Sequence, residues 1–75
     1  MGEKKIDCMD EICPMPLLRT IKEIKKIDVG EVLIIETNHN CSIINITEWA
    51  EKQGYNSDYM EISEGKWEIY IEKTK

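Results

Sequence analysis

Apolar and polar residues alternate or cluster in six segments of the chain. Four of these segments are predicted strands: residues 4–8, 31–37, 55–62 and 66–72. The second is apolar on both faces in its central Val-Leu-Ile-Ile run, which is typical of an interior strand. In the fourth, Trp67, Ile69 and Ile71 alternate with polar neighbours, which predicts one buried and one solvent-facing side. Residues 63–65 (Ser-Glu-Gly) between the last two segments predict a hairpin turn.

Two segments repeat apolar residues at helical spacing, namely residues 14–27 and a second run from Cys41 or Ser42 to Gln53. The predicted core-facing residues of the first are Leu17, Leu18, Ile21, Ile24 and Ile27, and those of the second are Ile43, Ile46 and Ala50, widened by Trp49. Gly30 and Gly54 are predicted to end the two helices, Gly30 as a left-handed turn residue. Asn40 or Ser42 is the predicted N-cap of the second helix.

The predicted order of elements is therefore β-α-β-α-β-β. Helical crossovers between strands followed by a terminal hairpin give a mixed four-stranded sheet. In so short a chain the economical arrangement is a two-layer α/β sandwich with both helices packed on one face. We expect residues 1–75 to form a single domain.

The charge balance restricts the classes of partner. The net charge is −5 and the pI about 4.8, which argues against non-specific binding to a nucleic-acid backbone. Cations nevertheless gather on the first helix, at Arg19, Lys22, Lys25 and Lys26. They form either a solvated face or a docking face for an acidic partner or for tRNA. The chain has no apolar run of transmembrane length and its start lacks the apolar region of a secretory signal, so we expect a cytoplasmic protein.

The segment Cys13-Pro14-Met15-Pro16-Leu17-Leu18 opens the first predicted helix with two prolines and a thiol. Proline is favoured at the first helical position, and Pro16 also falls within the first turn, where amides have no carbonyl partner to lose. Cys13 then occupies the N-cap, where the helix dipole favours a thiolate. Two interpretations remain open from the spacing alone: Cys13 is a nucleophile, or it is a small apolar filler.

The Cys-Pro-x-Pro motif, followed by two leucines, resembles the signature of the TusA/SirA-type sulfur-carrier family. The resemblance covers nearly the whole chain and implies the same two-layer sandwich. It implies that Cys13 carries sulfur as a persulfide, with Pro14, Met15 and Pro16 supporting it. It also implies a relay protein that acts with partner enzymes: a cysteine desulfurase or another sulfur donor, and a sulfur-accepting protein. The destinations in this family are tRNA thiolation, cofactor biosynthesis and sulfur metabolism.

Two departures bear on the pathway. The family often has glycine where this chain has Asp10, and this chain has a further thiol at Cys8. A second cysteine there, together with Cys41, resembles the YeeD-like subgroup, which is linked with YeeE-type membrane thiosulfate transporters. A transporter of that kind is accordingly a candidate donor.

The remaining candidates each have two interpretations. Cys8 is either a resolving thiol that attacks a persulfide on Cys13 or a buried strand-end residue. Arg19 and Lys22 are candidate partner-binding residues. Cys8, Cys13, Cys41 and His39 could form a Cys3His zinc site, but tight CxxC pairs are absent, and we predict no metal and no cofactor. We expect a monomer that does not bind nucleic acid directly. The alternative function is a small protein- or RNA-binding module with a redox-sensitive thiol.

Overall fold

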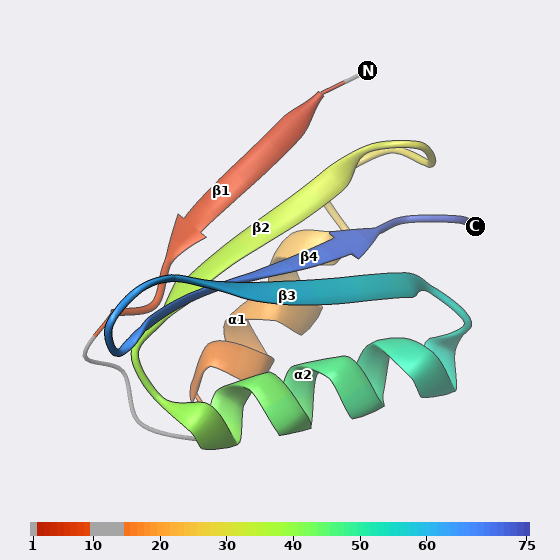
Figure 1. Cartoon of the computed structure of the whole chain (residues 1–75). Coiled ribbons are helices and arrows are strands. Elements are labelled where there is room, and N and C mark those ends of the chain that lie inside the picture. Colours follow the sequence, from red (N-terminus) through yellow and green to blue (C-terminus); the bar gives the residue numbers. More distant parts are fainter. Residues whose placement is uncertain (1, 10–14) are drawn as a thin grey trace.

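The structure, a computed structural model, describes residues 2–9 and 15–75. Its elements are β1 (Glu3–Asp7), α1 (Met15–Ile24), β2 (Val32–Thr37), α2 (Asn40–Gln53), β3 (Asn56–Ser63) and β4 (Lys66–Glu72). The order β-α-β-α-β-β is the predicted one (Figure 1). The predicted N-cap Cys13 and first-turn residue Pro14 lie outside the described residues, as does Asp10.

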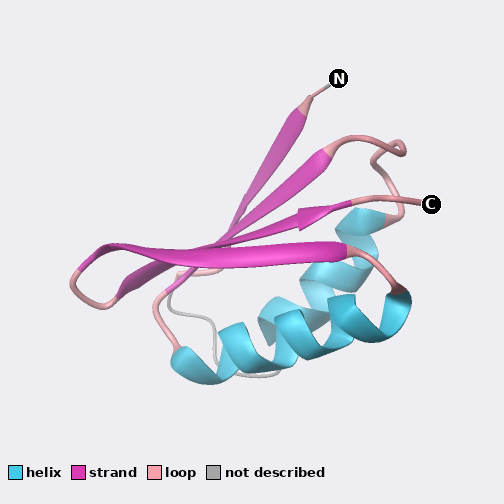
Figure 2. Ribbon diagram, turned by 45° about the vertical axis from the view of Figure 1, so that its right-hand side comes forward, coloured by secondary structure: helices cyan, strands magenta, loops and turns pink. Residues whose placement is uncertain are grey.

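The four strands form one mixed sheet in the order β1-β2-β4-β3. β1 runs parallel to β2, whereas β4 is antiparallel to both of its neighbours. Both helices lie on the same side of the sheet, and the other face carries none of the described helices (Figure 2). The predicted two-layer sandwich is therefore confirmed. β4, the last strand in sequence, pairs on both sides and lies inside the sheet.

The core lies between the sheet and the helices. Its fully buried side chains include Leu33 and Ile35 of β2, Ile46 of α2, and Ile69 and Ile71 of β4. These residues alternate along β2 and β4, as the period of a strand requires. The predicted dry face of β4 and the predicted core-facing residues of α2 are thus confirmed.

The first helix differs from its prediction in two respects. It ends at Ile24, although Ile27 beyond it is still buried. Leu18 is 53% exposed and does not join the core. Successive helical residues point about 100° apart, so two adjacent leucines do not share one narrow face. Pro16 and Thr20 are buried in α1 instead, and the Thr20 hydroxyl donates a hydrogen bond of 2.8 Å to the Pro16 carbonyl.

The C-terminal end of α2 follows an ordinary capping rule, whereas its N-terminal end differs from the prediction. Gly54 has φ 84° and ends α2, so that its own N–H and that of Tyr55 reach carbonyls of the last turn. The prediction that Asn40 or Ser42 caps α2 is wrong. Asn40 is already helical, and His39 occupies the N-cap in an extended conformation without a side-chain capping bond to any described residue. Ser42 turns its side chain into the protein.

Candidate functional site

The candidate site is the end of the sheet at which β1 and β2 finish. Because these strands are parallel, their carboxyl ends lie together, and each leads toward the beginning of a helix (Figure 1). Cys13 precedes α1 by two residues and lies outside the described part of the chain. The described residues that surround this end are those from Asp7 to Met9, the first turns of both helices, and residues 37–42.

Cys8 follows β1 directly and is fully buried within the hydrophobic core. Its N–H donates a hydrogen bond of 2.8 Å to the carbonyl of Glu36, which continues the pairing of β1 with β2 by one residue. This placement agrees with the interpretation of Cys8 as a packed strand-end residue. Its role as a resolving thiol stays a prediction.

Arg19 of α1 contacts Asp7, the residue before Cys8 in the sequence. Arg19 Nη1 donates a hydrogen bond of 2.8 Å to the backbone carbonyl of Asp7, which joins α1 to the end of β1. The carboxylate of Asp7 accepts the N–H of Met9 at 2.9 Å. A second link between the same two elements is the ion pair of Lys4 with Glu23, and the hydrogen bond from Lys4 is the main cause that lowers the pKa of Glu23.

The first turns of α1, which begins two residues after Cys13 in the sequence, present apolar side chains to solvent. Met15 is 49% exposed, and Leu18 lies three residues further along the same side of the helix. Lys22, one turn beyond Leu18, is also exposed. Pro16 faces the opposite way and is buried. Of the predicted partner-binding residues, Lys22 is thus on the surface, whereas Arg19 is hydrogen-bonded to the backbone of β1.

Two polar residues are buried at the end of β2 and in the first turn of α2, and the sequence singled out only the second of them, as a helix cap. Thr37 is fully buried, and its hydroxyl accepts the N–H of His39 at 3.2 Å. The Ser42 hydroxyl is buried with no hydrogen-bond partner among the described residues. Cys41 is exposed beside it. The signal for Thr37 was present in the sequence, because it continues the alternation of Leu33 and Ile35 into the core.

The open face of the sheet holds a network of charged side chains from three strands. Lys5 Nζ lies 3.6 Å from Glu36 and 3.1 Å from Glu68, and Lys66 Nζ lies 3.1 Å from Glu36. The Tyr70 hydroxyl donates a hydrogen bond to Glu68. This bond, followed by that from Lys5, lowers the pKa of Glu68. The pKa of the Lys5 ammonium is raised, mainly by its hydrogen bond to Glu68 and to a smaller extent by its interaction with Glu36.

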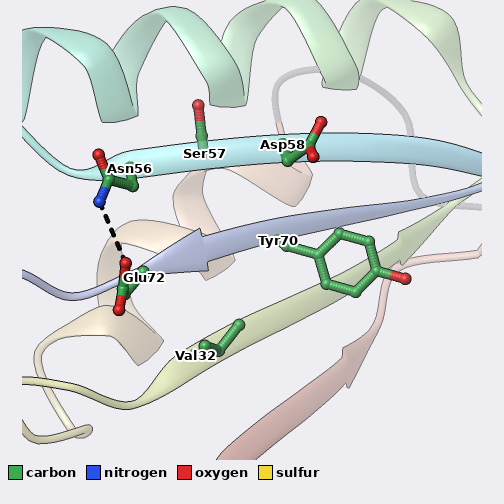
Figure 3. A pocket seen from close by; sticks show the side chains of 6 residues that line it. All are labelled: Val32, Asn56, Ser57, Asp58, Tyr70 and Glu72. Atoms are coloured by element: carbon green, nitrogen blue, oxygen red, sulfur yellow. Dashed lines mark hydrogen bonds between the residues drawn. The ribbon is translucent and has the colours of Figure 1, made fainter.

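A shallow depression of about 340 Å³ lies toward the other end of the open face, beside Val32 at the start of β2 (Figure 3). It is lined mainly by polar side chains, and Asn56 Nδ2 donates to Glu72 Oε1 there at 3.1 Å. It lies at the opposite end of β2 from the candidate site, and the described residues that line it include no cysteine. Within residues 2–9 and 15–75, no three His, Cys, Asp or Glu side chains form a metal-binding group. The zinc hypothesis includes Cys13 and is not tested by this finding. No helix in this part of the chain is long and apolar enough to span a membrane.

Comparison with known proteins gives consistent matches over nearly the whole chain. The sequence model of the family described as "Sulfurtransferase TusA" matches residues 4–73. A protein of Archaeoglobus fulgidus named "Putative sulfur carrier protein" is 33% identical over 93% of this chain and 96% of its own length. Escherichia coli "Putative sulfur carrier protein TsuB" is 30% identical over 93% and 95%. The crystal structure of a SirA-like protein from Desulfitobacterium hafniense superposes over 100% of both chains with a TM-score of 0.87 and 29% identity. The chain belongs to the TusA family.

Proposed function

We propose that this member of the TusA family is a sulfur carrier that holds sulfane sulfur as a persulfide on Cys13 and relays it to an acceptor protein. The observation that carries the proposal is the family match over residues 4–73, which includes the Cys-Pro-x-Pro segment. The relatives named as sulfur carriers support it. The fold is compatible with it, because α1 begins at Met15, two residues after Cys13 in the sequence.

The chemistry is two exchanges at sulfur. The Cys13 thiolate attacks the outer sulfur of a donor persulfide or of thiosulfate, the donor's S–S bond breaks, and the donor leaves as a thiolate or as sulfite. Cys13 then carries the persulfide. An acceptor thiolate attacks its outer sulfur in the same way and regenerates the Cys13 thiolate. Neither step needs an external oxidant or reductant, because the sulfane sulfur keeps its oxidation state. The positive end of α1 favours the thiolate that both steps require.

The exposed side of α1 is where we propose that donor and acceptor dock. Met15 and Leu18 offer apolar contact area on the helix that follows Cys13 in the sequence, and Lys22 adds a positive charge on the same side. The molecule as a whole is acidic, so a cationic helix selects a partner surface that has carboxylates around an apolar centre. The exposed apolar pair favours a protein partner over RNA, whose backbone is recognised mainly by cations.

The test is to incubate the protein with a cysteine desulfurase and cysteine, or with thiosulfate, and to measure its intact mass. We expect a gain of one sulfur atom that disappears on reduction, and that is absent from Cys13→Ser. Cys41→Ser is the matched control, because it removes an exposed thiol at the same end of the sheet, and it should still load. An adduct that persists in Cys13→Ser contradicts the proposal.

The identity of the partners is a separate matter. A cysteine desulfurase, a membrane thiosulfate transporter and the acceptor class all remain predictions, as do the cytoplasmic location, the monomeric state and the lack of direct nucleic-acid binding. Cys13→Ala that retains partner binding and cellular function would favour the alternative, a binding module with a redox-sensitive thiol.

A further inference from the structure

The carbonyl of Asp7 points away from the sheet. Alternate residues of β1 face β2: the Gly2 carbonyl accepts the N–H of Val32 at 3.2 Å, and the N–H of Cys8 reaches the Glu36 carbonyl at 2.8 Å. Asp7, at an odd position, therefore directs its carbonyl toward the outer edge. β1 is an end strand of the sheet, so no described strand lies on that side. The guanidinium of Arg19 takes this position and donates a hydrogen bond to the Asp7 carbonyl.

The same residue is held a second time through its side chain. The Asp7 carboxylate accepts the N–H of Met9, two residues later, at 2.9 Å. Such an aspartate turn fixes the direction in which the chain leaves the strand. Residues 7–9 are thus held by three hydrogen bonds. One comes from Arg19 of α1, one joins the N–H of Cys8 to β2, and one joins the Asp7 carboxylate to the N–H of Met9.

We propose that Arg19 and Asp7 are positioning residues for sulfur transfer. The Arg19 hydrogen bond sets the separation between the end of β1 and α1, and the Asp7 turn sets the exit direction. Together they hold the end of β1 against α1, the two elements that the connection bearing Cys13 joins. The inference rests on the proposed role of Cys13 as the carrier, and it assigns to Arg19 a task within this chain rather than a contact with a partner.

Arginine suits this task better than lysine. Its guanidinium is planar, permanently charged and has five N–H donors, so it can hold a carbonyl while making a further contact. An ammonium is a compact charge on a flexible chain and is held less firmly by a single carbonyl. We therefore expect Arg19→Lys to retain part of the effect and Arg19→Gln to lose it.

The test uses the isolated protein, so that no partner contributes. In a Cys41→Ser background, which removes the exposed competing thiol, the rate of Cys13 alkylation by iodoacetamide is measured against pH by peptide mass spectrometry. Arg19→Gln should raise the midpoint of the pH profile by about half a unit. Alkylation at pH 7 should then be about threefold slower. The midpoint rises because the sulfur is held less firmly at the positive end of α1.

Matched variants separate positioning from charge. Lys25→Gln removes one positive charge directly after α1 and should leave the profile unchanged. Asp7→Ala should slow alkylation, whereas Asp7→Asn keeps the accepting oxygen of the turn and should restore the wild-type rate. If circular dichroism shows that Arg19→Gln does not fold, the alkylation rates of Arg19→Lys and the two Asp7 variants test the proposal in its place.

An Arg19→Gln protein with the wild-type rate and midpoint overturns the inference, even where its binding to a donor protein is weaker. Equal slowing by Asp7→Asn and Asp7→Ala also overturns the role of the turn. Failure of the proposed function gives a different result, since wild-type Cys13 would then acquire no sulfur from any donor while the alkylation comparison stayed interpretable.

Discussion

Lys5 on β1 reaches across β2, and its Nζ lies 3.1 Å from Oε2 of Glu68 on β4. On the way the same ammonium lies 3.6 Å from the carboxylate of Glu36 on β2. The edge strand β1 is thereby linked to its neighbour β2 and to the next strand, β4, through side chains on the open face. Since β1 leads into the connection that carries Cys13, this network helps to hold one side of the candidate site.

The network makes the stability of the protein depend on pH through Glu68. Hydrogen bonds from Tyr70 and then Lys5 hold the pKa of this carboxyl below its ordinary value of 4.5. A lowered pKa in the folded state stabilises the protein above the pKa of the unfolded chain, and this contribution disappears as the pH falls through the folded value. The difference in unfolding free energy between wild type and Glu68→Gln should therefore be largest near neutral pH and shrink in acid.

Urea unfolding at several pH values measures this difference. Glu64→Gln, in the exposed hairpin turn, is the control for loss of one carboxylate. The prediction fails if the difference in unfolding free energy between wild type and Glu68→Gln is the same at neutral pH and at pH values below 4.5, the ordinary carboxyl pKa. The bonds of Glu68 would then not stabilise the fold.

Tyr70 should ionise above its ordinary pKa of 10.0. Its hydroxyl donates to the carboxylate of Glu68, and loss of that proton would leave two negative charges in contact. Subtracting the alkaline absorbance titration of Tyr70→Phe from that of the wild type isolates the phenolate of Tyr70. We expect this difference curve to be centred above 10.0, and to move to lower pH in Glu68→Gln. A curve centred at or below 10.0 would refute the hydrogen bond.

Two neighbouring residues of α2 test the assignment of the core. Ile46 is fully buried between helix and sheet, whereas Ile44 is 57% exposed. Ile46→Ala should lower the unfolding free energy by about 2–5 kcal/mol, because it leaves a cavity in the core. Ile44→Ala should change it by no more than about 0.5 kcal/mol. Equal losses measured by urea unfolding would mean that α2 packs with a different side toward the sheet.

The described cysteines should differ sharply in reactivity. Cys41 is exposed at the start of α2, and Cys8 is fully buried. Under native conditions iodoacetamide should modify Cys41 readily, while Cys8 should react only as fast as the strand end opens. In urea the two rates should converge. Rapid native modification of Cys8 would show that it is accessible enough to act as a resolving thiol.

The sequence predicted the elements well because their periodicities are strong. The alternation in residues 66–72 and the helical spacing of Ile43, Ile46 and Ala50 each admit one way to bury apolar side chains, and the structure uses it. The adjacent Leu17 and Leu18 were both predicted to face the core, but only Leu17 packs against it. Which of them does so is decided by how α1 lies on the sheet, and no local pattern contains that information.

The chemistry at Cys13 stays a prediction, and the contacts at this end of the sheet were not predicted. Helix-terminal physics left Cys13 as either a nucleophile or an apolar filler, and the family resemblance favoured a sulfur carrier. The hydrogen bond from Arg19 to the Asp7 carbonyl joins residues twelve positions apart and involves a backbone atom. No pattern of side chains in the sequence predicts such a contact, and Arg19 was therefore predicted to bind a partner instead.

The sheet order β1-β2-β4-β3 also determines when the protein can acquire its fold during synthesis. β2 remains without its antiparallel neighbour until β4 has been made, and β3 can join the sheet only through β4. The segments that surround the thiol are therefore translated early but gain their final support late. A nascent chain halted before Lys66 would expose the apolar side of β2, and we expect such a chain to depend on chaperones or to aggregate.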